Sequence, residues 1–302
     1  MTLHDVTAGT VGSITDGWSS PLDTPAAENS EARPTWAPDA VKRVSLAGCS
    51  VDLCTEETVA ALVTRTLRDA SRPALAVASA NLDHLHHFGL DGRQRRPLPR
   101  DRESLRWLTL LDGAPLVSRV RRWSGEEYPR LAGSDLIGPL LAEVARVGSR
   151  VGFLGGQPEM LEVLRRRLDE DYPTLQVAGC WSPRRSELAD ADANARLVEE
   201  IRAAQVEVLV VGLGKPRQEL WIDANAEMTE ARVLLAFGAS ADFLAGQVTR
   251  APQWLRDNGL EWSYRLAHEP RRLGRRYLIQ GPRAMSRLVF QPVEILATAS
   301  WG

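Results

Sequence analysis

The chain has 302 residues, of which 44% are hydrophobic and 25% charged, and its formal net charge is −2. This composition suits a globular protein with a large buried core, in one large α/β domain or two smaller ones. A net charge this close to zero argues against nucleic-acid binding through overall charge. The three cysteines form neither a disulfide framework nor a Cys-x-x-Cys zinc site, so we expect a reduced cytoplasmic protein.

Residues 1–40 are rich in Thr, Ser, Pro, Asp and Glu and have little apolar patterning. They lack the apolar core of a secretory signal peptide, and we expect them to form a disordered leader. No run of about 18 apolar residues occurs in the chain, so the sequence predicts no membrane-spanning helix.

Strand and helix patterns alternate along the next part of the chain. Residues 43–53 alternate like a strand or small hairpin, and Thr55 is placed to cap the helix whose apolar stripe follows. A buried strand is expected at 75–78, with a polar exit at 79–81. The charged segment 89–103 contains prolines and is expected to be an exposed loop.

The alternation continues to about residue 237. Further strands are predicted at 105–111, 151–154, 175–181, 206–211 and within 231–237, with helical patterns between most of them. Strands that alternate with helices are typical of parallel βαβ units. The sequence therefore predicts an α/β fold with a parallel sheet flanked by helices.

The composition changes after this region. Between Arg250 and Arg287 there are nine arginines, no lysine and three acidic residues, which gives the segment a net charge of +6. The pattern is helical and rich in tryptophan. We therefore expect three parts, namely the leader at 1–40, an α/β core at 41–249 and an Arg/Trp-rich helical appendage at 250–302.

Ligands of open parallel sheets bind beyond the carboxyl ends of the strands. Five predicted strand exits carry polar residues or glycines: Ser79 with Asn81, Asp112 with Gly113, Gly155 with Gly156, Gly212 and Gly214 with Gln218, and Gly238 with Asp242. Glycines let a phosphate approach the backbone, and a following helix N-terminus favours negative charge. The same glycines could simply make tight turns. Neither the stretch with Gly155 and Gly156 nor the stretch with Gly212 and Gly214 is a Walker loop or a G-x-G-x-x-G fingerprint.

Asp112 follows an apolar run and is a candidate general base, because a partly dry edge suits a carboxylate to proton abstraction. It could equally form an ordinary Asp-Gly turn. Ser79 and Asn81 could hydrogen-bond a sugar or cap a turn.

Three histidines, His84, His86 and His87, lie close together in the sequence. They lack a carboxylate pattern such as H-E-x-x-H, so we expect a helix surface rather than a metal site. The cysteines are interpreted as packing residues.

Eight stretches taken together resemble one family: SANLDHL, LDGAPLV, RLAGSDL, GFLGGQP, YPTLQVAG, VGLGKPRQELWI, DFLAGQVTRAPQW and GLEWSYRLAHEPRRLGRRY. Glycine turns recur in many α/β proteins, but the last three stretches are specific. Over residues 44–277 the chain is similar to the WecG/TagA/CpsF family of bacterial glycosyltransferases.

The resemblance implies a Rossmann-like core and a C-terminal appendage that meets the membrane. It implies inverting transfer of a sugar from a UDP-sugar, typically UDP-N-acetylmannosamine or its uronic acid, to a polyprenyl-diphosphate-linked sugar. No metal or other cofactor is expected. The products of such enzymes enter teichoic acid linkage units, enterobacterial common antigen, capsule or exopolysaccharide.

The resemblance also assigns roles to residues. The proposed base of the family falls on Asp112, the acceptor-side pair on Ser79 and Asn81, and an active-site arginine on Arg130. A further catalytic position falls on Gln218, directed at the donor sugar or diphosphate. Substrate-binding positions are expected at Gly155, Gly156, Gly212, Gly214, Asp242, Arg265, Arg272 and Arg275. Arginine suits a diphosphate because its planar fork binds two oxygens at once.

The same segment combines its arginines with four aromatic residues, Trp254, Trp262, Tyr264 and Tyr277. Aromatic and cationic residues together fit a helix on an anionic lipid surface. They also fit a solvated basic helix packed on the core. The segment after Arg287 is apolar but short, able to touch lipid and not to cross it. We expect a cytoplasmic protein, peripheral at the inner face of the plasma membrane, that could also form homo-oligomers.

Three other functions compare less well with the sequence. A dehydrogenase needs an early G-x-G-x-x-G with an acidic residue about 20 positions on, and the chain has no such arrangement. A non-catalytic nucleotide- or nucleic-acid-binding protein using the Arg-rich segment remains the alternative, although it leaves the polar strand exits unexplained. A family member without catalytic activity is disfavoured because Asp112 and Gln218 are both present.

Overall fold

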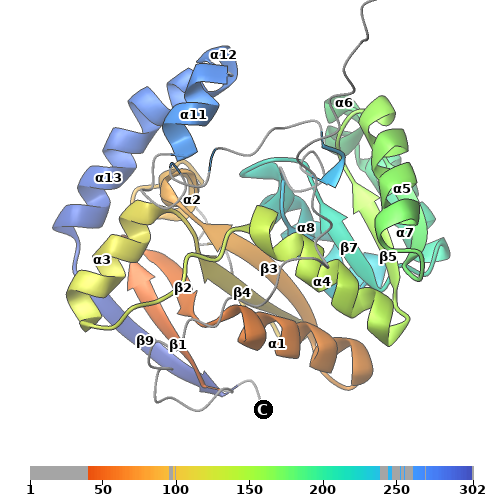
Figure 1. Ribbon diagram of the computed structural model, residues 1–302, viewed down its shortest axis with the longest axis horizontal. Helices are drawn as coiled ribbons and strands as arrows, with labels where there is room; N and C mark the ends of the chain where they lie inside the picture. Colours follow the sequence, from red (N-terminus) through yellow and green to blue (C-terminus); the bar gives the residue numbers. More distant parts are fainter. Residues whose placement is uncertain are drawn as a thin grey trace, which may run out of the picture. The chain divides into compact units, whose positions relative to one another are not determined.

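The computed structural model describes residues 40–94, 98, 100–238, 244–246, 252, 255, 261–268 and 270–300 (Figure 1). These residues belong to one compact unit, 36–302. The expected leader lies outside the described residues apart from Ala40, and so does Asp242. The helix backbone at Arg265 and Arg272 is described, but their side chains are not.

The described strands form one mixed, mostly parallel sheet. Their order across the sheet is β6-β5-β7-β8-β3-β4-β2-β1-β9. The strands are β1 (Ala40–Leu46), β2 (Cys49–Leu53), β3 (Ala74–Ala80), β4 (Leu105–Leu111), β5 (Arg150–Leu154), β6 (Gln176–Trp181), β7 (Val208–Val211), β8 (Val233–Ala236) and β9 (Val293–Ser300). Neighbours from β6 to β2 run parallel, whereas β1 is antiparallel to both β2 and β9.

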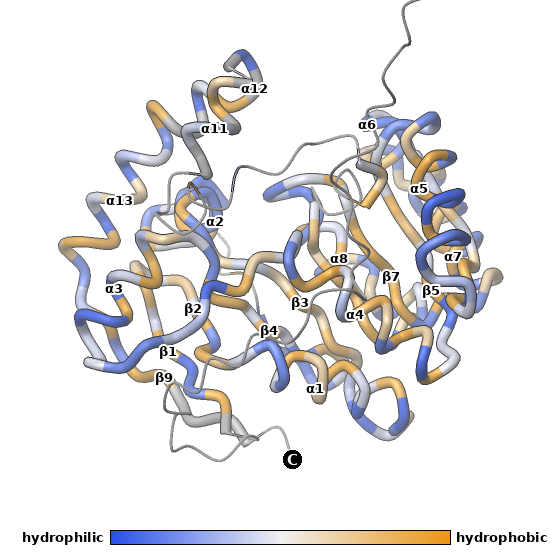
Figure 2. Tube along the Cα trace, in the orientation of Figure 1, coloured by the Kyte–Doolittle hydropathy of each residue, from blue (hydrophilic) through white to orange (hydrophobic). Residues whose placement is uncertain are grey.

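The central strands are short apolar runs, as is typical of strands covered on both faces. Every residue of β7 and β8 is buried, and apolar residues are concentrated in the central strands (Figure 2). The expected α/β fold is confirmed. The sheet is mixed rather than wholly parallel, because the hairpin of β1 and β2 and the final strand add antiparallel pairs at one edge.

Helices cover both faces of the sheet (Figure 1). One face packs on α1 (Glu56–Arg68), α4 (Gly133–Val147) and α5 (Pro158–Asp171), and the other on α6 (Arg185–Ala189), α7 (Ala191–Ala203) and α8 (Arg217–Thr229). A third core cluster joins β1 and β2 to α2 (Leu82–Phe88), α3 (Ala114–Ser124) and α13 (Gly281–Phe290). The expected cap of α1 is present, with Thr55 Oγ1 accepting from the Thr58 N–H at 3.3 Å.

The C-terminal region contains the expected helices. They are α11 (Glu261–His268), α12 (Pro270–Arg275), the π-helix η1 (Arg276–Gln280) and α13, which packs against α2 and α3. After α13 the chain forms β9, which pairs antiparallel with β1. The segment after Arg287 therefore completes α13 and then forms an edge strand of the core sheet. Among the described helices, none combines the length and apolarity needed to cross a membrane.

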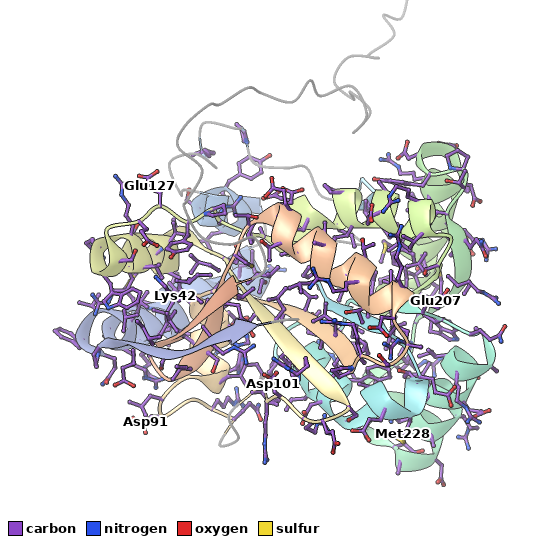
Figure 3. The ribbon with its side chains drawn as sticks, turned by 90° about the horizontal axis from the view of Figure 1, so that it is seen from below. Lys42, Asp91, Asp101, Glu127, Glu207 and Met228 are labelled. Atoms are coloured by element: carbon purple, nitrogen blue, oxygen red, sulfur yellow. The ribbon has the colours of Figure 1, made fainter. Side chains whose placement is uncertain are left out.

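The charged segment 89–103 is anchored to the sheet rather than being an exposed loop throughout. Leu98 is buried. Asp101, labelled in Figure 3, accepts from Arg43 Nη1 at 2.6 Å and from the Trp107 N–H at 2.7 Å. The expected exposed loop is present, since the described part of the segment contains no helix or strand and many of its residues are exposed, but Leu98 and the pair of Asp101 with the β1 cation anchor it to the sheet.

Candidate functional site

The order of the strands brings the five predicted exits together. The strands β5, β7, β8, β3 and β4 are consecutive neighbours and run parallel, so their carboxyl ends share one edge of the sheet. Ala80 pairs with Leu111 at the ends of β3 and β4. Asn81 and Asp112, each one residue farther along, therefore lie side by side at this edge.

Asn81 joins two structures through its two amide atoms. Its Oδ1 caps α2 by accepting from the His84 N–H at 3.2 Å. Its Nδ2 donates to Asp112 Oδ2 at 3.3 Å. Because the oxygen is committed to the helix, the nitrogen is the atom directed at the carboxylate. Both open interpretations of Asn81, as a cap and as a group at the site, are thus compatible.

Asp112 also faces a guanidinium group. Arg130 Nη1 lies 3.9 Å from Asp112 Oδ1, and its Nη2 lies 2.9 Å from Asp135 Oδ2. The Asp112 side chain is 15% exposed, so it is accessible but largely shielded from water. Gly113 continues from it with φ 90°, a conformation that favours glycine, and the chain enters α3 at once. The carboxylate is thus held between an amide and a cation, facing solvent at the edge.

Ser79 is buried at the end of β3, and its carbonyl oxygen accepts from Lys215 Nζ at 2.8 Å. The structure thus places Ser79, Asn81 and Asp112 along adjacent strand exits, as their sequence positions predicted, and the segment between α3 and α4 brings Arg130 to Asp112.

The two glycine turns touch each other. Gly155 has φ 104°, and a Cβ there would lie 2.7 Å from the carbonyl oxygen of Gly212. Gly156 and Gly214 also have positive φ, at 94° and 74°. At Gly155 the close approach of the turn from β7 to α8 is itself sufficient reason for glycine. The turns leave the N-termini of α5 and α8 without side-chain caps.

Gln218 lies beneath its turn rather than on the surface, with 2% of the residue exposed. Its Nε2 donates to the Ala236 carbonyl at 2.6 Å and to Glu219 Oε1 at 3.2 Å. Its Oε1 has no hydrogen-bond partner among the described residues. The side chain joins the exit of β8 to the start of α8.

A buried ion pair that was not predicted from the sequence lies at the same place. Lys215 Nζ lies 2.6 Å from Glu219 Oε1, and the two side chains are 8% and 1% exposed. The available signal was the spacing of four residues across a helix start, which places a lysine and a glutamate on one face.

The histidines of α2 do not lie on a helix surface, and that expectation was wrong. His84 is fully buried, His87 is nearly so and His86 is partly buried. Burial, reinforced by the positive charge of Lys215, holds the pKa of His84 well below its ordinary value. The cause is that α2 is covered by β3 beneath it and by η1 and α13 beside it. In the described part of the chain no cluster of three His, Cys, Asp or Glu could hold a metal.

The appendage arginines are only partly described. Arg275 is exposed on α12, whereas the side chains of Arg265 and Arg272 lie outside the described residues, as does Asp242. Large apolar side chains are exposed nearby on η1 and α13: Leu278, Ile279, Val289 and Phe290. Of these, Phe290 is 83% exposed.

In an open, mostly parallel α/β sheet, ligands bind beyond the carboxyl ends of the strands, where this chain carries a shielded carboxylate and glycine turns. The chain belongs to the glycosyl transferase WecG/TagA/CpsF family, whose model matches residues 44–296. The match runs from β1 into β9 and includes every site residue considered above. The protein is accordingly a glycosyltransferase of a family that acts in cell-surface polysaccharide synthesis.

Proposed function

We propose that the protein transfers a sugar, N-acetylmannosamine or a related hexose, from a UDP-sugar to a polyprenyl-diphosphate-linked sugar, with inversion and without a metal. The observation that carries the proposal is the placement of Asp112. Its carboxylate lies at the carboxyl edge of the sheet, 3.3 Å from Asn81 Nδ2 and 3.9 Å from Arg130 Nη1.

Asp112 acts as the general base. It removes the proton from the acceptor hydroxyl while that oxygen attacks the anomeric carbon of the donor and the bond to UDP breaks. Asn81 fixes the carboxylate through its amide, because its own oxygen is held by α2. Ser79 and Asn81 form the acceptor side of the site.

The donor lies along the two glycine turns. Gly155, Gly156, Gly212 and Gly214 allow its diphosphate to approach the backbone, and the uncapped N-termini of α5 and α8 favour negative charge there. Gln218 and Asp242 complete the donor side. The leaving UDP gathers charge that cationic side chains stabilise, and we assign this role to Arg265, Arg272 and Arg275.

The C-terminal helices place the enzyme on the inner face of the plasma membrane. Support comes from Leu278, Ile279 and Phe290, which are exposed on η1 and α13, and from the exposed arginines Arg275 and Arg283 on the same run of helices. Apolar side chains that enter the lipid boundary and arginines that meet anionic headgroups bind such a surface together.

The experiment is a UDP-release assay with a short-chain prenyl-diphosphate-GlcNAc acceptor and a panel of UDP-sugars, with and without EDTA. The expected result is release that requires the acceptor, is selective for one donor and is unchanged by EDTA. Release abolished by EDTA would contradict the metal-independent mechanism. No release with any donor, together with DNA binding that weakens steeply with salt, would favour the non-catalytic nucleic-acid-binding alternative.

A further inference from the structure

Lys215 is a charged side chain at the site to which the proposed mechanism gives no role. It lies in the turn between β7 and α8, yet its ammonium points inward. Nζ is 2.8 Å from the carbonyl oxygen of Ser79 and 2.6 Å from Glu219 Oε1. The lysine side chain is 8% exposed and the glutamate side chain 1% exposed.

Fold stability alone does not account for such a pair. Removing two charges from water is costly, and well-packed apolar residues of similar volume often stabilise a protein as well or better. A buried pair is therefore best explained by what it holds in place. Here it holds the ends of strands that carry the site residues.

The pair connects three strand exits. Glu219 Oε1 accepts from Lys215 Nζ and also from Gln218 Nε2. Gln218 donates in turn to the carbonyl of Ala236, the last residue of β8. Lys215 itself lies just beyond β7, and its bond to Ser79 reaches the end of β3. One carboxylate oxygen thus links β8, β7 and β3.

The end of β3 leads directly to the candidate base. Two residues after Ser79, Asn81 donates to Asp112 Oδ2. The amide N–H of Asp112 also donates to the carbonyl of Ala80, at 2.9 Å. A displacement of the Ser79 carbonyl is therefore transmitted to the Asp112 carboxylate through the backbone and through the Asn81 amide.

We propose that Lys215, paired with Glu219, is a positioning residue that fixes the acceptor-side exit of β3 against the turn from β7 to α8. The inference rests on the proposed function, which assigns the exit of β3 to the acceptor and the turn from β7 to α8 to the donor. Lys215 does not act on substrate, because its ammonium is already held by a carboxylate and a carbonyl. Its loss changes the relative placement of the two substrates, so it lowers kcat more than it raises either KM.

The test compares the kcat of three variants: Lys215→Met, Glu219→Gln and the double variant that combines them. The matched control is Arg232→Met. Arg232 also donates to backbone carbonyls, those of Thr66, Asp69 and Arg72, but it precedes β8 at the opposite edge of the sheet. We expect Lys215→Met to lower kcat on the order of 100-fold per folded molecule, as a misplaced reacting group does, with both KM values within about threefold. Arg232→Met should lower stability without changing kcat.

The double variant tests the pairing. Residues that act as one unit give non-additive effects, so its kcat should be no lower than that of Lys215→Met. Single losses that multiply in the double variant would contradict the pairing. Equal kcat in Lys215→Met and wild type would overturn the proposal.

A second measurement does not depend on turnover. Hydrogen exchange of the Asp112 amide should accelerate about tenfold in Lys215→Met relative to Arg232→Met at matched stability, because the strand exit is released locally. Equal exchange in the two variants would overturn the positioning role. If the wild type released UDP from no donor while exchange responded as expected, the proposed function would fail and the structural role of Lys215 would stand.

Discussion

The side chains of Asn81 and Asp112 are hydrogen-bonded across the exits of two neighbouring parallel strands, 31 residues apart in the sequence. The contact depends on strand order, because β3 and β4 pair in register up to Ala80 and Leu111. It also depends on α2, whose first turn occupies the other amide atom of Asn81. One residue therefore links helix capping to the orientation of the candidate base.

The two roles of Asn81 can be separated by substitution. Asn81→Ser retains an oxygen that can cap α2 but lacks the amide that donates to Asp112. We expect kcat to fall about 10- to 100-fold. A hydrogen bond to a charged group contributes about 1.5–3 kcal/mol, which corresponds to a change in rate of this size. Asn81→Ala should show the same kinetic loss and a further decrease of about 1 kcal/mol in the free energy of unfolding, from the lost cap. Equal stability of the two variants would contradict the capping role.

The contact between the glycine turns can be tested at Gly155. A Cβ there would lie 2.7 Å from the Gly212 carbonyl oxygen, so Gly155→Ala should lower the free energy of unfolding by about 2–4 kcal/mol through overlap and strain. Gly148→Ala is the matched control, because Gly148 also has positive φ, at 74°, but a Cβ there meets nothing within 4 Å. Gly148→Ala should lower the free energy of unfolding by only about 1–2 kcal/mol. Urea unfolding measures both, and equal losses would contradict the close approach.

His84 makes stability depend on pH. Burial lowers its pKa in the folded protein, so the native state keeps this ring neutral where the unfolded chain binds a proton. Its contribution to stability is therefore present above the ordinary histidine pKa of about 6.5 and is lost as pH falls below it. Urea midpoints between pH 8 and pH 5 should fall less steeply in His84→Gln than in wild type. An unchanged slope would assign the dependence to other groups, such as His87, whose pKa burial also lowers.

Membrane binding should depend on the exposed apolar residues of α13. Phe290→Asp removes an 83% exposed aromatic side chain and adds a negative charge. It should reduce co-sedimentation with vesicles containing anionic lipid by about tenfold, the equivalent of roughly 1.4 kcal/mol. Met228→Asp is the matched control, because Met228 is 54% exposed on α8, away from the C-terminal helices (Figure 3). Equal binding by the two variants would contradict the assigned surface.

Much of the fold followed from local pattern. Apolar runs such as 208–211 and the cap at Thr55 are signals within a few residues of the elements they specify. Parallel pairing then required the exits carrying Asn81 and Asp112 to share an edge. The family match over residues 44–296 confirms the resemblance that the sequence motifs indicated.

The features that sequence reasoning missed depend on long-range contacts. The pairing of β9 with β1 joins segments at opposite ends of the chain, and nothing within 293–300 specifies that partner. The burial of His84 results from helices and strands packed around α2 rather than from its own periodicity. The inward direction of Lys215 likewise depends on the carbonyl of a strand more than 100 residues earlier.

Whether Asp112 is the base for sugar transfer is decided by the acceptor-dependent UDP release of Asp112→Asn. Asparagine keeps the size of the side chain but cannot accept the proton, so kcat should fall on the order of 1,000-fold or more, with donor binding and thermal stability close to wild type. UDP release at the wild-type rate would contradict the account and remove Asp112 from the mechanism.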